Sequence, residues 1–232
     1  MGKRLLYLNA WDDDEFKEPW REKVLELKRK AREQGLHRTF EDMKTITSHV
    51  LEEGNSAIEI FGWSIPAIPS FIKSKVRGGQ VYSIDADPDS KHELFHNFIS
   101  LYQAYTSGMG RKGEPLGYIN DSEYLGLLES ALSRIDLGRA KRLSDSNPSE
   151  GKELCELAEH FYDMIGIQQI THVLPPYPEQ IDGIDAVFEH NGFGFCREKE
   201  KEGIIHGTDR ILNPGGYIVF KDVPQELVAI QY

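Results

Sequence analysis

Short apolar runs and amphipathic stretches alternate through most of this chain, and this alternation most constrains how it can fold. Each run is almost continuously apolar, which is typical of a strand buried on both faces of a sheet. Helical patterns separate the runs, so we expect a parallel sheet covered by helices on both faces, the doubly wound α/β architecture. The expected strands are Ala57–Phe61, Val81–Asp85, Gln169–Leu174, Ile184–Phe188 and Tyr217–Lys221.

The length of the chain, 232 residues, falls within the range of one α/β domain, so we expect a single domain over residues 1–232. Helical patterns at Glu15–Gln34 and Phe40–Glu53 predict an N-terminal helical segment over residues 1–55. Residues 90–150, between the second and third strands, are too many for an ordinary connection. We expect them to form a helical insertion, with helices at Glu93–Tyr105 and Glu123–Arg142, that acts as a lid over the carboxyl ends of the strands.

Composition and charge favour a cytoplasmic globular protein that acts on a small molecule or a protein. The formal net charge is −11, which disfavours nucleic acid as a partner. Two short basic clusters, Lys28–Arg32 and Arg139–Arg142, are expected to be solvated helix faces. The sequence contains neither an apolar run long enough for a membrane span nor a recognisable signal peptide. Its two cysteines, Cys155 and Cys196, form no CxxC pair and are expected to be thiols in the core.

Several segments, in their order along the chain, resemble the class I S-adenosylmethionine-dependent methyltransferases. AIEIFGWS resembles the first strand and cofactor loop of that family, and VYSIDADP resembles the second strand with its terminal acid. GIDAVFEHNG resembles the fourth strand, and ILNPGGYIVF resembles the turn that leads into the fifth. The resemblance implies a Rossmann-like methyltransferase sheet with S-adenosylmethionine as the cofactor.

The same resemblance implies a set of cofactor-binding residues at the ends of the first two strands. A carboxylate at a strand end can accept two hydrogen bonds from a ribose diol, and a glycine lets the backbone approach a ligand. Asp85 is the strongest candidate for the ribose, although a turn aspartate in this position would have the same sequence. The implied cofactor-binding residues are Glu59, Gly62, Trp63, Ser64, Asp85 and Ala86.

Polar residues directly after the fourth strand are the candidates for catalysis. Glu189, His190 and Asn191 would lie at the mouth of the pocket. His190 would act as a general base that removes a proton from the methyl acceptor, with Glu189 beside it and Asn191 contacting the substrate. A purely structural role for the histidine stays open at this stage.

Two other motifs suggest rival functions. His92, Glu93 and His96 form an HExxH pattern, which resembles the zinc metallopeptidase motif; a third ligand would have to come from Glu114, Asp121 or Glu123. The run Leu174–Tyr177 (LPPY) resembles the tetrapeptide of amino-group methyltransferases that act on nucleic-acid bases, but it lacks the leading Asp or Asn, and we expect a rigid loop.

The cofactor loop itself departs from the family pattern. In FGWSIP only Gly62 remains of the glycines, and bulky residues occupy positions where small ones are usual. A non-catalytic binding protein that kept the fold is therefore a third hypothesis.

Overall fold

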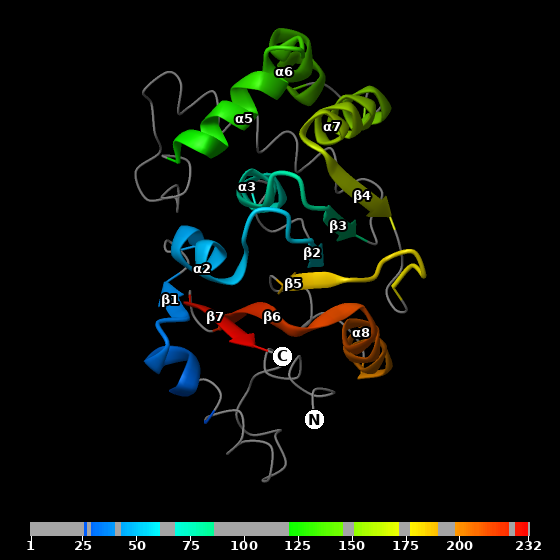
Figure 1. Cartoon of the computed structure of the whole chain (residues 1–232). Helices are drawn as coiled ribbons and strands as arrows, with labels where there is room; N and C mark the ends of the chain where they lie inside the picture. Colours follow the sequence, from blue (N-terminus) through cyan, green and yellow to red (C-terminus); the bar gives the residue numbers. More distant parts are fainter. Residues whose placement is uncertain are drawn as a thin grey trace.

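The computed structural model describes residues 26, 29–39, 43–60, 68–85, 121–145, 151–171, 177–189, 198–222 and 226–231 (Figure 1). Its strands are β1 (His37–Thr39), β2 (Ala57–Ile60), β3 (Val81–Asp85), β4 (Ile167–Thr171), β5 (Ile184–Glu189), β6 (Leu212–Asp222) and β7 (Glu226–Gln231). Its helices are α2 (Met43–Val50), α3 (Ile68–Val76), α5 (Ser122–Leu132), α6 (Leu137–Asp145), α7 (Gly151–Ile165) and α8 (Glu198–Ile211).

The strands form one seven-stranded sheet in the order β1-β7-β6-β5-β2-β3-β4. Strands β4, β3, β2, β5 and β6 pair in parallel, and β7 runs antiparallel to both β6 and β1. Within the parallel group the chain first moves from β2 to β3 and β4, then returns to the other side of β2 for β5 and β6. This is the order of a doubly wound sheet, and it confirms the predicted fold class.

The central strands are buried on both faces, as their apolar sequences predict. All four residues of β2 are buried, and β5 is buried at every position except the partly exposed Asp185. The crossovers β2-α3-β3 and β3-α7-β4 step toward one edge of the sheet, and β5-α8-β6 steps toward the other. Since such crossovers are right-handed, α3 and α7 cover one face and α8 covers the opposite face.

Turn chemistry sets where the strands begin. Gly166, with φ +75°, ends α7, and β4 starts at the next residue, two positions earlier than the pattern predicted. Gly216 lies against β5 so closely that a Cβ there would be 2.8 Å from the carbonyl oxygen of Asp185. The asparagine-proline-glycine-glycine stretch lies within the span of β6 but has no partners on β5, because Leu212 pairs with Ile184 and Tyr217 with Ala186. It is a bulge with a turn glycine, Gly215 at φ +84°, and regular pairing starts at Tyr217, where the strand was predicted to begin.

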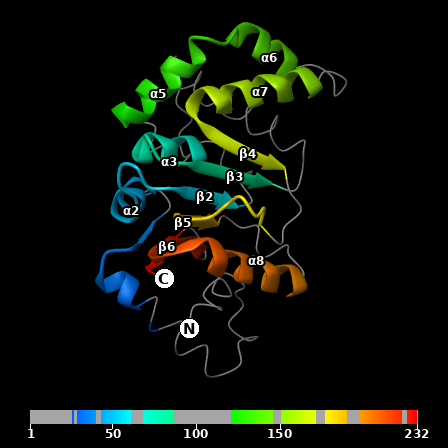
Figure 2. The same cartoon turned by 45° about the vertical axis from the view of Figure 1, so that its right-hand side comes forward.

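The described part of the insertion forms an outer helical layer. Helix α5 packs against α3 and α7, and α6 packs against α7 (Figure 2). The single helix expected over Glu123–Arg142 is in fact two helices, because the backbone N–H of Arg139 donates to Asp136 Oδ1 at 2.8 Å and caps a new helix. Residues 86–120 lie outside the described residues, so the lid stays a prediction.

The N-terminal segment contributes a strand as well as helices. Gly35, with φ +72°, ends the first helical stretch as expected, and α2 lies within the second. Between them, β1 pairs with β7 at the edge of the sheet, which the sequence did not indicate. None of the described helices is long and apolar enough to span a membrane.

Candidate functional site

The order of the parallel strands reverses between β2 and β5, and this reversal marks where doubly wound sheets bind ligands. Glu59 is the last residue but one of β2, Asp85 ends β3 and Glu189 ends β5. The carboxyl ends of the three most central parallel strands therefore each carry an acid. These are the three predicted site residues that the structure describes.

Register and alternation determine which face of the sheet each acid occupies. Glu59 is paired with Ser83 on β3, so the two side chains point to the same face. Asp85 lies two residues beyond Ser83 and points to that face as well. Glu189 is paired with Ile60, the neighbour of Glu59, and therefore points to the opposite face. The structure brings Glu59 and Asp85 together and separates Glu189 from both.

Glu59 is a fully buried carboxyl group that has few hydrogen-bond partners among the described residues. Its exposed fraction is 0%. Ser83 Oγ donates to its Oε2 at 3.3 Å, and Oε1 has no hydrogen-bond partner among the described residues. Burial holds the pKa of Glu59 well above its ordinary value; the Ser83 hydrogen bond lowers it only in part, and the charge of Asp85 raises it further. Glu59 therefore tends to keep its proton.

Helix α7 packs on the face of the sheet that carries Glu59. Tyr162 is buried, and its pKa is raised by that burial and by the nearby charge of Glu59. Its ring meets Phe161 edge to face, with centroids 5.5 Å apart. Both aromatic residues belong to the last turns of α7, whose carboxyl end leads into the amino end of β4.

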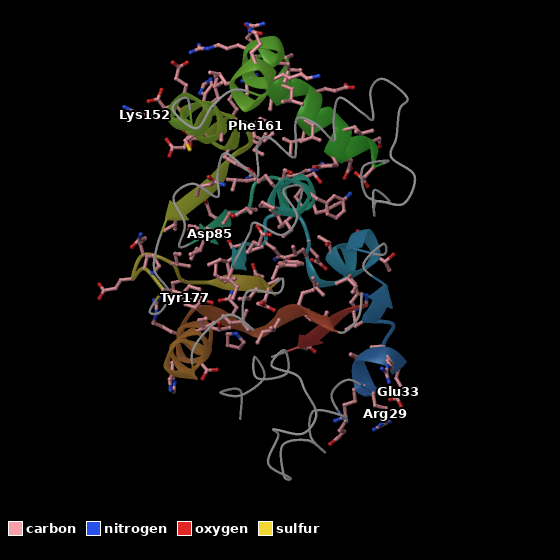
Figure 3. All side chains as sticks on the ribbon, turned by 180° about the vertical axis from the view of Figure 1, so that it is seen from behind. Arg29, Glu33, Asp85, Lys152, Phe161 and Tyr177 are labelled. Carbon is pink, nitrogen blue, oxygen red and sulfur yellow. The ribbon has the colours of Figure 1, made fainter. Side chains whose placement is uncertain are left out.

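Asp85 is more accessible than Glu59. It is partly exposed, pairs in register with Thr171 of β4 and lies among the central strands (Figure 3). Glu189, in contrast, is completely buried at the end of β5. Of the two acids on the Glu59 face, Asp85 is the more exposed, although its Oδ2 atom is itself buried.

The other candidate residues fall outside the described part of the chain. They are Gly62, Trp63, Ser64, Ala86, His190 and Asn191, together with His92, Glu93 and His96 of the HExxH pattern. Their roles stay predictions. Within the described residues, no group of three or more His, Cys, Asp or Glu side chains could hold a metal ion.

Two acids considered as a third zinc ligand have structural partners. Asp121 Oδ2 lies 2.8 Å from Lys75 Nζ, and its Oδ1 accepts from the backbone N–H of Tyr124 at 3.1 Å, which caps α5. Glu123 pairs with Arg77 at 2.7 Å. These contacts fasten the amino end of α5 to the carboxyl end of α3.

The tyrosine of the LPPY run is part of the core. Tyr177 is buried against α8, where its hydroxyl lies 3.1 Å from Thr208 Oγ1. Thr208 is near the end of α8, just before β6 begins, so this tyrosine lies near the amino end of β6. Arg210 fixes the same loop by donating to the carbonyl oxygens of four residues, namely Tyr177, Pro178, Glu179 and Ile181. No sequence pattern indicated the role of this arginine.

The described basic residues of the two clusters are exposed and lie beside acidic side chains. Arg29 pairs with Glu33, and Lys30 pairs with Glu26 at 2.8 Å. Arg139 reaches Glu153 of α7 at 2.6 Å. These contacts agree with the prediction that the clusters are solvated faces.

The sheet order and the acids at its switch point define a doubly wound α/β protein with a candidate ligand site at the carboxyl ends of β2, β3 and β5. No family model matches the chain, and no curated protein matches it. Among solved structures, it is similar to precorrin-6y C5,15-methyltransferase from Geobacter metallireducens, with 14% identity over 78% of this chain and 62% of that one and a TM-score of 0.38.

It is also similar to a protein from Galdieria sulphuraria provisionally assigned as a sarcosine dimethylglycine methyltransferase. That match has 13% identity, covers 89% of this chain and 52% of the other, and has a TM-score of 0.41. The chain thus spans less than two thirds of the length of either structure. Both TM-scores are below 0.5.

Proposed function

We propose that the protein is an S-adenosylmethionine-dependent methyltransferase whose acceptor is a small molecule or a protein group. One observation carries the proposal: Glu59 and Asp85 end neighbouring parallel strands, point to the same face and lie beside the switch point of a doubly wound sheet. Ligands of such sheets bind outside the carboxyl ends of the strands at this point.

The residues present fit an adenosyl ligand on two counts. Asp85 ends its strand partly exposed, as an acid that accepts hydrogen bonds from a ribose diol must be. Glu59 has a buried oxygen, Oε1, without a partner among the described residues, and such atoms normally have one. A ligand or the segment that follows β2 would supply that partner.

S-adenosylmethionine, when bound, supplies a methyl group on a cationic sulfur, and methyl transfer needs little more from the protein than positioning. Asp85 would hold the ribose, and Glu59 would position the cofactor-binding segment that follows β2. Gly62, Trp63, Ser64 and Ala86 follow β2 and β3 in sequence and would complete the cofactor site. His190 would take the acceptor's proton, with Glu189 and Asn191 as its neighbours in sequence.

Thermal-shift titration tests the proposal directly. A ligand that binds only the folded state raises its apparent stability, so S-adenosylmethionine and S-adenosylhomocysteine should both raise the melting temperature. The shift should be lost in Asp85→Ala and kept in Asp163→Ala, a matched control on the exposed face of α7. No shift with either compound in the wild-type protein would overturn the proposal.

The rival functions give different results in the same experiments. A zinc hydrolase would carry stoichiometric metal that is lost when His92→Ala and His96→Ala are combined. A non-catalytic relative would show the thermal shift, but the wild-type protein would transfer no methyl group to any acceptor and would not differ in this from the His190→Ala variant.

A further inference from the structure

The strongest unexplained feature of the molecule is the buried carboxyl group of Glu59. It has an exposed fraction of 0%, accepts one hydrogen bond from Ser83 at 3.3 Å and leaves Oε1 without a partner among the described residues. A buried carboxylate without a cation is costly, so the group stays neutral until a positive charge arrives.

The described groups that face Glu59 provide no such charge. Strand β3 contributes Ser83 and Asp85, and Asp85 adds a second negative charge. Strand β5 contributes Phe188, its register partner, and α7 contributes the hydroxyl of Tyr162. All of these side chains are neutral or acidic.

The two lysines of α3, the helix that follows β2, have partners of their own. Helix α3 carries Lys73, which donates to the carbonyl oxygen of Gly79 at 2.7 Å. It also carries Lys75, which pairs with Asp121 at 2.8 Å. Both contacts lie at the carboxyl end of α3, toward the amino ends of the strands. Neither lysine is among the causes that shift the pKa of Glu59.

We propose that the site at the ends of β2 and β3 takes an organic cation, and that Glu59 releases its proton to solvent as that cation binds. The inference rests on the proposed function, in which the sulfonium of S-adenosylmethionine is the cation. The charges balance: the ligand brings one positive charge, and one proton leaves for the buffer. The site therefore distinguishes the cationic methyl donor from its neutral-sulfur product.

Isothermal titration calorimetry in buffers of different ionisation enthalpy counts the protons released on binding. S-adenosylmethionine and S-adenosylhomocysteine have the same amino and carboxyl groups, so the difference between them isolates the sulfonium. We expect the methyl donor to release about one proton more than the product at neutral pH. Its affinity should also rise with pH, by up to about tenfold per pH unit while Glu59 is protonated.

Three variants make the test specific to Glu59. Glu59→Gln should bind without the extra proton and without the pH dependence. Glu129→Gln, an exposed acid of α5, should behave like the wild-type protein. Ser83→Ala removes the hydrogen bond that lowers the pKa of Glu59, so it should move the pH dependence to higher pH and serves if Glu59→Gln fails to fold.

The outcomes separate the two proposals. Equal proton release by the two compounds, or the same extra proton in Glu59→Gln, would overturn this inference and leave the methyltransferase proposal standing. Absence of binding by both compounds would overturn the methyltransferase proposal and this inference with it.

Discussion

Lys75 Nζ lies 2.8 Å from Asp121 Oδ2, and both side chains are nearly buried, with exposed fractions of 12% and 5%. Lys75 also lies over the ring of Phe71, 5.3 Å from its centroid. This pair joins α3, which packs on the sheet, to α5, the first described helix of the insertion. The insertion is thus fastened to the domain by a charge pair with little access to water.

Replacing Lys75 with methionine should destabilise the protein substantially. The substitution keeps the length of the side chain but leaves the carboxylate of Asp121 buried without its cation. Breaking a buried pair from one side costs about 3 to 5 kcal/mol. Urea denaturation followed by circular dichroism would measure the change in the free energy of unfolding.

The neighbouring ion pair provides the control. Arg77 and Glu123 join the same two helices, but their side chains are 56% and 50% exposed. Arg77→Met should therefore cost less than about 1 kcal/mol. Adding Asp121→Asn to Lys75→Met should restore part of the lost stability, and equal effects of Lys75→Met and Arg77→Met would contradict the interpretation of the buried pair.

Glu59→Gln should stabilise the protein, increasingly so at higher pH. Burial raises the pKa of Glu59 above its ordinary value of 4.5, so the folded state binds more protons than the unfolded state above that pH. The contribution of Glu59 to stability is therefore largest below pH 4.5 and falls by up to about 1.4 kcal/mol per pH unit until the folded pKa is reached.

Melting temperatures of the two proteins between pH 4.5 and pH 8 would check this sign. Other titrating groups are common to both proteins, so they cancel in the difference. A difference that stays constant across the range would show that Glu59 has an ordinary pKa in the folded state.

Gly207→Ala should destabilise the contact between α8 and the loop before β5. A Cβ at Gly207 would overlap the ring of Tyr177, which is buried and held by Thr208. Overpacking of this kind costs about 1 to 3 kcal/mol. Chemical denaturation would measure the loss.

Gly126→Ala is the matched control on α5. Gly126 is exposed, and an added Cβ would meet nothing within 4 Å. There the better helix propensity of alanine should stabilise the protein by up to about 1 kcal/mol. If both alanines act in the same direction, the packing of Tyr177 on Gly207 does not limit stability.

Local patterns predicted the elements whose ends carry turn residues. Helix α3 begins and ends at local sequence signals, since Pro69 lies in its first turn and Gly78 and Gly79 follow it. Strand β3 ends at Asp85, as expected. Strands β1 and β7 were missed, because a three-residue edge strand has no pattern of its own and its partner lies almost at the other end of the sequence.

Only part of the candidate site could be predicted from the sequence. Its acids could be named from their positions at strand ends, but the face each one occupies depends on pairing register. Glu59 becomes the register partner of Ser83, and Ile60 that of Glu189, only when strands that are distant in the sequence pair with β2. The uncompensated burial of Glu59 likewise depends on residues from three other elements.

The pairing of β1 with β7 has a consequence for how the protein is made. Residues 37–39 leave the ribosome long before residues 226–231, yet their only described sheet partner is that late segment. Since α2 also contacts β7, the sheet pairing of β1 and part of the packing of α2 can form only after that late segment has been made, whereas the contact of α2 with α3 can form earlier. Loss of residues 226–231 would therefore release structure at both extremities of the polypeptide.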